Sequence, residues 1–284
     1  HGTSFAAPHV AGIAALALAI QPDLTASDFM DLARVTSRDL GPVGYDREYG
    51  HGLIDAQALL ASLKSSFPDV PYASWYFGYV ANLARRSIIN GYPDGTFKPN
   101  RQVRRDHAAK MIANAAGLDS RGKKASFTDL GPEHEMSAFI AALVDKGAIR
   151  GYPDGSYRPD RPIIREHVCQ IVAKAFDLER GDLPLAFNDL SGQAEADSYI
   201  EILASNGIVK GTGQGRFQPG SEVTRAELSK ILSVAMAVSA IQEAEREVSI
   251  SAFDRAQLLI NALPQDQDLV MREYLQTRLS AVRP

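Results

Sequence analysis

The first residues of the chain place a serine where it could act as a nucleophile. Ser4 follows Gly2, which allows a tight turn, and precedes a run of small residues that suits a closely packed helix. A hydroxyl at a helix N-terminus lies in a field that favours a developing oxyanion, and the Ser4 backbone N–H can donate to that oxyanion. The alternative is that Ser4 only caps the helix.

An arginine that recurs every 60 residues is the second chemical pattern. Arg105, Arg165 and Arg225 each follow a Gly-rich loop, at the expected start of a helix. A helix N-terminus already favours anions, and an arginine on its first turn adds a full positive charge. We therefore expect a ligand that carries a carboxylate or a phosphate. The alternative is a solvated arginine that pairs with a loop carboxylate such as Asp94 or Asp154.

The arginines belong to a repeat that occurs three times between about residues 66 and 240 without insertion or deletion. Phe-x-Asp motifs lie at 67–69, 127–129 and 187–189, and Gly-rich turns lie at 91–97, 151–157 and 211–217. Apolar residues at helical spacing flank each turn, so each copy is predicted to be helix, Gly/Pro-rich loop, helix. Two short helices bury little surface alone, so we expect the three copies to pack around a shared core.

The second helix of the third copy is predicted to begin with a capping box. Thr224 would cap the helix and Glu227 would return the bond. The other copies break the pattern, with Arg104 or Ile164 in place of the threonine and His107 or His167 in place of the glutamate. Since only the arginine of Thr-Arg-Ala-Glu occurs in all three copies and capping does not need it, we expect it to serve another purpose.

The motifs of each copy resemble the S-layer homology (SLH) module, which is usually found as a triplet: Phe-x-Asp, an apolar helix, Gly-Tyr-Pro-Asp-Gly-x-Phe-x-Pro and Val-Thr-Arg-Ala-Glu. The resemblance covers residues 66–240. It implies a pseudo-threefold α-helical arrangement whose grooves hold a pyruvylated secondary cell-wall polysaccharide. The family has an aromatic residue early in the first helix of each copy. Trp75 occupies that position in the first copy, and Glu135 and Glu195 occupy it in the other two. The residues expected to bind the polymer are Arg105, Arg165, Arg225, Trp75, Asp94 and Asp154.

Residues 2–12 read Gly-Thr-Ser-Phe-Ala-Ala-Pro-His-Val-Ala-Gly and resemble the nucleophile motif of the subtilisin-like serine endopeptidases. The similarity spans residues 1–62 and implies the C-terminal fragment of an α/β domain with Ser4 as nucleophile. His9 is not the family's general base, and His51 is interpreted as a loop residue. The triad His and Asp and the oxyanion Asn belong to upstream motifs, so we expect a missing part before His1. Without a base, this chain alone is predicted not to hydrolyse peptides.

Composition and charge exclude several classes of protein. The chain is 45% apolar and 23% charged, as in globular proteins, and it lacks the run of about 20 apolar residues that a membrane-spanning helix needs. Its single cysteine, Cys169, excludes a disulfide framework. The net charge is −4, but residues 66–125 carry ten Lys+Arg and four Asp+Glu, which favours an anionic partner. Aromatics interleaved with arginine are too sparse for nucleic-acid binding.

No cofactor or metal is expected in this chain, because each Gly-rich turn offers too few carboxylates for calcium. Calcium is a candidate only for the missing peptidase part. The predicted organisation is multidomain and mainly α: a peptidase fragment at 1–65, SLH repeats at 66–125, 126–185 and 186–240, and a helical tail at 241–284. In that tail, two helices are predicted to form a hairpin that acts as a spacer or binds a partner helix. Its facing residues would be Leu258, Leu259 and Ala262 against Val270, Leu275 and Leu279.

We therefore expect the C-terminal part of a secreted, cell-wall-anchored, subtilisin-like endopeptidase of a Gram-positive surface. The triplet would bind the polysaccharide without a covalent bond, and the parent protease would act on protein or peptide substrates. The alternative is a non-catalytic S-layer or cell-wall-binding protein with a peptidase remnant.

Overall fold

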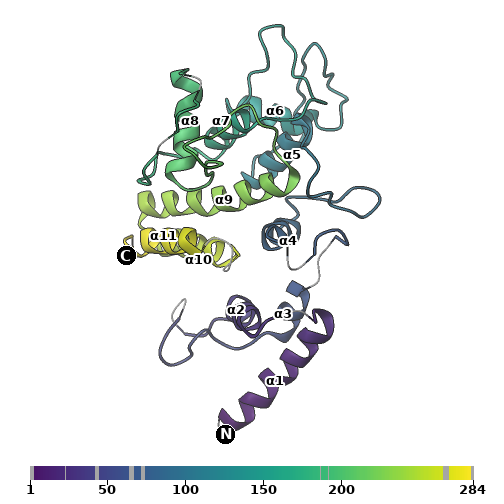
Figure 1. Cartoon of the computed structure of the whole chain (residues 1–284). Coiled ribbons are helices and arrows are strands. Elements are labelled where there is room, and N and C mark those ends of the chain that lie inside the picture. The colour runs from purple at the N-terminus through teal and green to yellow at the C-terminus, as the bar shows by residue number, and fades with distance from the viewer. Residues whose placement is uncertain are drawn as a thin grey trace.

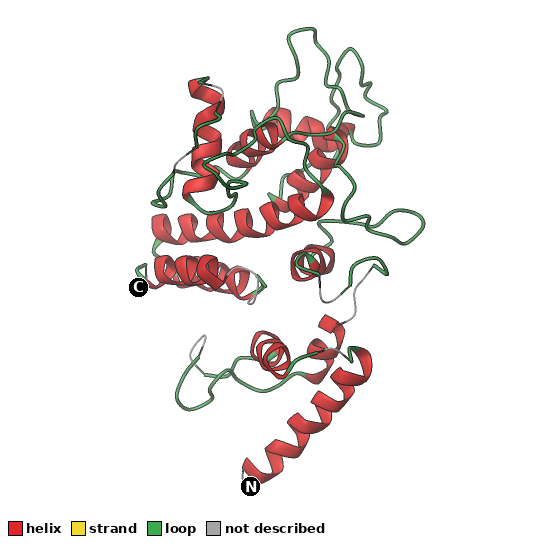
Figure 2. Cartoon of the chain, viewed as in Figure 1, coloured by secondary structure: helices red, strands yellow, loops and turns green. Residues whose placement is uncertain are grey.

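The computed structural model describes residues 3–22, 24–41, 45–63, 67–71, 74–185, 187–190, 192–264 and 269–282. These residues form eleven α-helices, and their β-structure is limited to isolated bridges (Figures 1 and 2). The mainly α-helical prediction is confirmed. The helices are α1 (Thr3–Ile20), α2 (Ala26–Thr36), α3 (Ala56–Leu63), α4 (Phe77–Arg85), α5 (Arg105–Ala115), α6 (Ser137–Asp145), α7 (Arg165–Ala175), α8 (Ala194–Ser205), α9 (Arg225–Glu247), α10 (Ile250–Asn261) and α11 (Leu269–Ser280).

Helices α1 to α3 pack around a small cluster of their own. Its buried members are Ala17, Leu24, Phe29, Leu59 and Leu63. A capping box at Thr25 and Asp28 begins α2. Five buried apolar residues, at about 1.5–3 kcal/mol for each large side chain, make a small core.

The six helices α4 to α9 supply two helices to each copy, and the copies are joined in a ring. The second helix of each copy packs against the first helix of the next, α5 against α6 and α7 against α8, and α9 closes the ring by packing on α4 (Figure 1). All six helices share one apolar core with the tail. The expected pseudo-threefold arrangement is therefore confirmed.

Three short extended segments close a triangle of backbone hydrogen bonds between the copies. The N–H of Val103 donates to the carbonyl of Val223 over 2.8 Å, that of Ile163 to Val103 over 2.8 Å, and that of Val223 to Ile163 over 3.0 Å. All three side chains are buried. Because each segment donates once and accepts once, the triangle is complete only when all three copies are present.

The Phe-x-Asp motif has a structural role in each copy. The carboxylate of Asp69 accepts the N–H of Phe97 and of Lys98, each over 2.7 Å. Lys98 adopts a left-handed φ of 56°, so the aspartate holds a backbone turn that few residues adopt readily. Asp129 and Asp189 bind the equivalent N–H pairs in the other copies. The loop between the two helices of each copy is therefore tied to the start of that copy.

The glycine that begins each Gly-rich turn leaves room for the motif's phenylalanine. A Cβ on Gly91 would lie 2.7 Å from the Phe67 ring and 2.9 Å from the Thr96 carbonyl. The rings of Phe67 and Phe97 are 5.3 Å apart. The same aromatic pair occurs in the other copies. The turn can therefore close over an aromatic pair only because glycine has no side chain.

The tail is a hairpin that packs on α9 within the same core. Leu259, Leu275 and Leu279 are buried as expected, but Leu258 is 66% exposed and Val270 is 76% exposed, so their predicted contact is wrong. The buried face of α10 consists of Ala252, Ala256, Leu259 and Ile260, which follow the helical spacing of three or four residues, and Leu258 lies on another face. Helix α9 also continues past residue 240, the predicted end of the third repeat, to Glu247.

Candidate functional site

Each repeated arginine is the first residue of its copy's second helix, and its side chain reaches the Gly-rich loop of another copy. The Nε of each arginine donates to the backbone carbonyl of the aromatic residue that ends that loop. The distances are 3.0 Å from Arg105 to Tyr157, 3.0 Å from Arg165 to Phe217, and 2.7 Å from Arg225 to Phe97. The arginines thus follow the same cyclic order as the helices, copy one to two, two to three and three to one.

The guanidinium groups lie over aromatic rings. Arg225 is 4.9 Å from the centre of the Tyr92 ring and 4.4 Å from that of Phe97. Arg165 lies 4.3 Å from the Phe217 ring. A guanidinium that donates to carbonyls and stacks on aromatic faces is stabilised without a carboxylate.

The expected alternative, in which these arginines pair with Asp94 or Asp154, is not found. Asp94 accepts the N–H and hydroxyl of Thr96 and forms an ion pair with Lys98 over 2.8 Å. Asp154 makes the same bonds in its own turn and pairs with Arg158 over 3.0 Å. These contacts lower the pKa of Asp154 to about 2, chiefly through the hydrogen bonds from Ser156. The structure thus places both aspartates inside their turns.

The three arginines differ in burial. Arg105 is 6% exposed and Arg225 is 5% exposed, whereas Arg165 is only partly buried. Desolvation lowers the pKa of Arg225. Of the three, Arg165 therefore has the side chain most accessible to a ligand.

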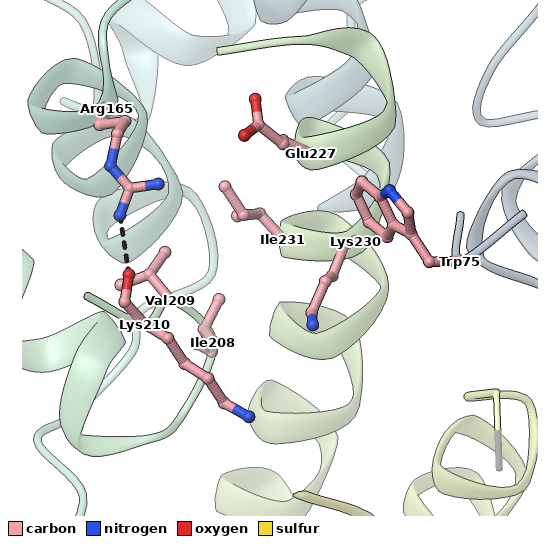
Figure 3. A pocket seen from close by; sticks show the side chains of 8 residues that line it. All are labelled: Trp75, Arg165, Ile208, Val209, Lys210, Glu227, Lys230 and Ile231. Atoms are coloured by element: carbon pink, nitrogen blue, oxygen red, sulfur yellow. Dashed lines mark hydrogen bonds between the residues drawn. The ribbon is translucent and has the colours of Figure 1, made fainter. Parts of the chain in front are cut away.

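Arg165 lines a pocket of about 140 Å³ between the start of α4, the third copy's loop and α9. Its lining residues are Trp75, Arg165, Ile208, Val209, Lys210, Glu227, Lys230 and Ile231. Figure 3 shows Trp75 and Arg165 on opposite sides, with Ile231 and Lys230 between them. Ile208, Val209 and Ile231 make an apolar floor, and the charged groups and Trp75 surround it. Arg165 also donates to the Lys210 carbonyl over 2.9 Å.

Glu227, the single carboxylate among the lining residues, is held by the predicted capping box. Its Oε2 accepts the N–H of Thr224 over 2.8 Å, and its own N–H donates to the Thr224 hydroxyl over 3.3 Å. The lining therefore has three cationic side chains and one carboxylate already engaged in helix capping. A positive field over an apolar floor suits a ligand that joins an acidic group to an apolar one.

Histidine replaces Glu227 in the two related grooves. His167 lies 3.2 Å from Arg105, from its Nδ1 to the arginine Nη1. Burial, reinforced by Arg105, lowers the pKa of His167 to about 4. The ring is therefore neutral at pH 7, and Nδ1 accepts the arginine proton. Burial also lowers the pKa of His107.

The two grooves with histidine also lack the tryptophan. Glu195 stands at the position of Trp75 and forms an ion pair with Lys174 over 3.6 Å. Glu135, the other counterpart, lies near enough to His107 to act on its charge. Trp75 itself is 40% exposed and forms an edge-to-face pair with Tyr76. The three grooves thus share a backbone plan but present different chemistry.

The serine predicted to be the nucleophile lies in the first turn of α1 and is exposed. Within the described ranges, no hydrogen bond joins Ser4 to a histidine. Nδ1 of His9 lies 2.7 Å from the carbonyl of Phe5 in its own helix, and the His51 ring packs 5.0 Å from Tyr45. A serine hydroxyl without an adjacent base is a weak nucleophile.

Apart from the cap residue Glu227, five lining residues were not predicted from the sequence: Ile208, Val209, Lys210, Lys230 and Ile231. Lys230 follows Glu227 by three positions and so lies on the same helix face, a signal that could have found it. In the part of the chain that the structure describes, no three acidic, histidine or cysteine side chains gather as a metal site would require. None of the described helices is long and apolar enough to span a membrane.

Two parts of the chain match known families. The S-layer homology domain matches residues 66–109, 126–169 and 186–229, and the subtilase family matches residues 1–52. Among similar proteins, an uncharacterized cell wall amidase of Bacillus anthracis is 35% identical over 194 residues, which cover 63% of this chain and 35% of that protein.

Two further relatives are named for surface functions. The cellulosome-anchoring protein of Acetivibrio thermocellus is 34% identical over 149 residues, 49% of this chain and 33% of that protein. The S-layer protein EA1 of Bacillus anthracis is 30% identical over 179 residues, 62% of this chain and 20% of that protein. The matched region spans about a third of the length of the first two relatives and a fifth of the third.

Proposed function

Because this chain carries three S-layer homology domains after a subtilase-family segment, and is thus a cell-surface protein associated with the cell wall, we propose that it is part of a wall-anchored subtilisin-like endopeptidase. The triplet binds secondary cell-wall polysaccharide without a covalent bond. The peptidase segment belongs to the part of the protein that cleaves peptide bonds.

The pocket beside Arg165 is the observation that supports polysaccharide binding. A pyruvyl ketal on a sugar carries a carboxylate and a methyl group on one carbon. Arg165, Lys210 and Lys230 would attract the carboxylate, and the apolar floor would accept the methyl group. Trp75 offers an exposed aromatic face to the sugar ring. The pocket volume of about 140 Å³ suits one acidic substituent rather than a length of chain.

The groove of Arg165 is the principal site, and those of Arg105 and Arg225 contribute less. All three guanidinium groups contact carbonyls and aromatic rings, but those of Arg105 and Arg225 are buried whereas that of Arg165 is partly exposed. A ligand carboxylate can therefore approach Arg165 without first uncovering the side chain, unlike Arg105 and Arg225. Asp94 and Asp154 serve the polymer site by holding their turns.

Binding to isolated cell walls tests this assignment. We expect Trp75→Ala and Arg165→Ala each to weaken binding about tenfold, the loss for about 1.4 kcal/mol. Arg121→Ala is the matched control, because Arg121 is an exposed arginine that pairs with nearby Asp119 and does not line the pocket. Removal of the secondary polymer from the walls should abolish binding. Undiminished binding to stripped walls, or by the two pocket variants, would contradict the proposal.

A different class of function, a non-catalytic surface protein with a peptidase remnant, is favoured by the similarity to the S-layer protein EA1. We predict that the chain alone neither turns over casein nor reacts with an active-serine probe, because no adjacent base activates the hydroxyl. A Ser4→Ala variant is the control for background labelling. Turnover together with labelling that Ser4→Ala removes would refute this prediction.

A further inference from the structure

We propose that the tail hairpin, α10 with α11, is a clasp that positions Trp75 for ligand binding. The positioning role rests on the proposed function of the Arg165 pocket. The clasp itself rests on contacts between the hairpin and both walls of that pocket.

The hairpin is built into the core of the ring. Helix α10 buries four apolar residues and α11 buries three, all in the cluster that contains the three copies: Ala252, Ala256, Leu259, Ile260, Met271, Leu275 and Leu279. Both helices pack against α9, which lies between the hairpin and the upper helices in Figure 1. Helix α9 supplies Lys230 and Ile231 to the pocket. The hairpin thus supports the wall that carries them.

Polar contacts attach the hairpin to two elements of the third copy. Nη2 of Arg278, in α11, donates to Glu245 of α9 over 2.7 Å, and Nη1 donates to Asn206 at the end of α8 over 2.8 Å. Arg255 of α10 donates to both carboxylate oxygens of Glu243. Nε and Nη2 of Arg278 bind the two carboxylate oxygens of Glu245, and a bidentate contact of this kind fixes orientation as well as proximity.

The other wall of the pocket is held through a glycine. A Cβ on Gly78, in the first turn of α4, would lie 2.6 Å from Cγ of Pro264, between the two tail helices. The equivalent helix positions in the other copies are Ala138 and Ser198. Glycine is unfavourable inside a helix, and Gly78 has no left-handed φ that would require it. Gly78 therefore serves the close approach of Pro264.

Trp75 lies three residues before Gly78 and is joined to it by a tight turn. The N–H of Phe77 donates to the Ser74 carbonyl over 3.0 Å, and the rings of Trp75 and Tyr76 are 5.4 Å apart. A shift of the first turn of α4 must therefore move Trp75. The hairpin contacts α4 through Pro264 and α9 through its buried face, so it sets the separation between Trp75 and Lys230.

The fluorescence of Trp75, the one tryptophan of the chain, tests the clasp without any polymer. We expect Gly78→Ala to shift the Trp75 emission maximum and to raise its quenching by acrylamide, because the new Cβ displaces Pro264. Pro264→Ala removes the Cγ that the new methyl would meet. The double variant should restore most of the native emission and quenching. Ser198→Ala, at the equivalent position of the third copy, is the matched control.

Wall binding then tests the positioning role. Gly78→Ala should weaken binding about fivefold, and the double variant should recover it. Unchanged emission and quenching in both Gly78→Ala and Pro264→Ala would overturn the clasp. Altered emission with undiminished binding would overturn the positioning role. If the unsubstituted chain itself fails to bind walls, the proposed function fails, and the fluorescence result still decides the clasp.

Discussion

The repeated arginines show how one residue type serves two purposes in quasi-equivalent sites. Arg225 is buried and donates to the carbonyls of Phe97 and Asn90 over 2.7 and 2.9 Å. Arg165 makes the equivalent bonds but is partly exposed at a pocket. The surroundings of the side chain, rather than its motif, therefore separate a structural arginine from one that can meet a ligand.

This difference predicts opposite effects of alanine substitution. Arg225→Ala leaves two carbonyls without their donor and removes a buried side chain, so we expect a loss of about 2–4 kcal/mol in the free energy of unfolding. Arg165→Ala should cost less stability and more wall binding. Chemical denaturation and wall binding of both variants provide the measurements. Equal stability losses would show that burial does not distinguish the two residues.

The histidine beside Arg105 predicts a pH dependence of stability. The pKa of His167 is lowered to about 4 by burial and by Arg105, so the unfolded chain binds a proton at higher pH than the folded chain. The contribution of neutral His167 to the free energy of unfolding is therefore complete above the ordinary histidine pKa of about 6.5. It is lost as the pH falls from there toward 4. The His167→Gln variant has no titrating group at this position. Its free energy of unfolding should therefore differ less between pH 7 and pH 4.5 than that of the original chain. An unchanged difference would exclude His167 as the cause.

At the scale of elements, helix α9 has the most connections. It packs on α4, α5, α10 and α11, and it begins with a capping box that its two counterparts lack. A single well-capped helix thus joins the first copy, the third copy and the tail.

The cap predicts the effect of a small change. Thr224→Ala removes the hydroxyl that accepts the Glu227 N–H, so we expect a loss of about 1 kcal/mol in the free energy of unfolding. It also removes the hydrogen bond from the Thr224 hydroxyl to Glu227 Oε2 and leaves the one from the backbone N–H of residue 224. The carboxylate can then turn toward the pocket more easily, and the extra negative charge should weaken the binding of an acidic polymer. Thr224→Ser keeps the hydroxyl and serves as the control. Urea denaturation and wall binding test both effects, and a Thr224→Ala variant as stable as the original would contradict the role of the cap.

At the scale of the whole molecule, the ring and the peptidase-like segment have separate cores. The ring and its tail share one buried cluster, and α1 to α3 have another. The ring is closed by contacts between its first and third copies, such as the bond from Val103 to Val223 and the packing of α4 on α9.

Two deletions should therefore behave differently. Residues 66–284 alone should unfold cooperatively at nearly the same temperature as the full chain. Residues 1–185, which lack the third copy and tail, lose the partner of α4 and two sides of the backbone triangle, and should show no cooperative transition. Calorimetry of both chains gives the comparison. A cooperative transition in residues 1–185 would show that two copies suffice.

The sequence alone determined the local and repeated features. The step of 60 residues, the helix pair in each copy and the Thr224 cap follow from spacing and residue type, because local patterns determine helices and their ends. The matches to the S-layer homology and subtilase families confirm the resemblance of the motifs. Trp75 and Arg165 were named from their motifs, and the structure brings them to one pocket.

Only the tertiary structure decided which copy each arginine contacts, which of the three is accessible, and that the tail packs on the ring. Lys210 and Lys230 line the same pocket as Trp75, although they belong to elements far from it in the sequence. Pro264, in the tail after the third copy, packs against Gly78 in the first copy. A local sequence pattern does not predict contacts between residues that are far apart in the sequence. Residue spacing specifies which face of a helix is buried but not which element covers that face. The closure of three copies into a ring, with the hairpin against α9, supplies that information.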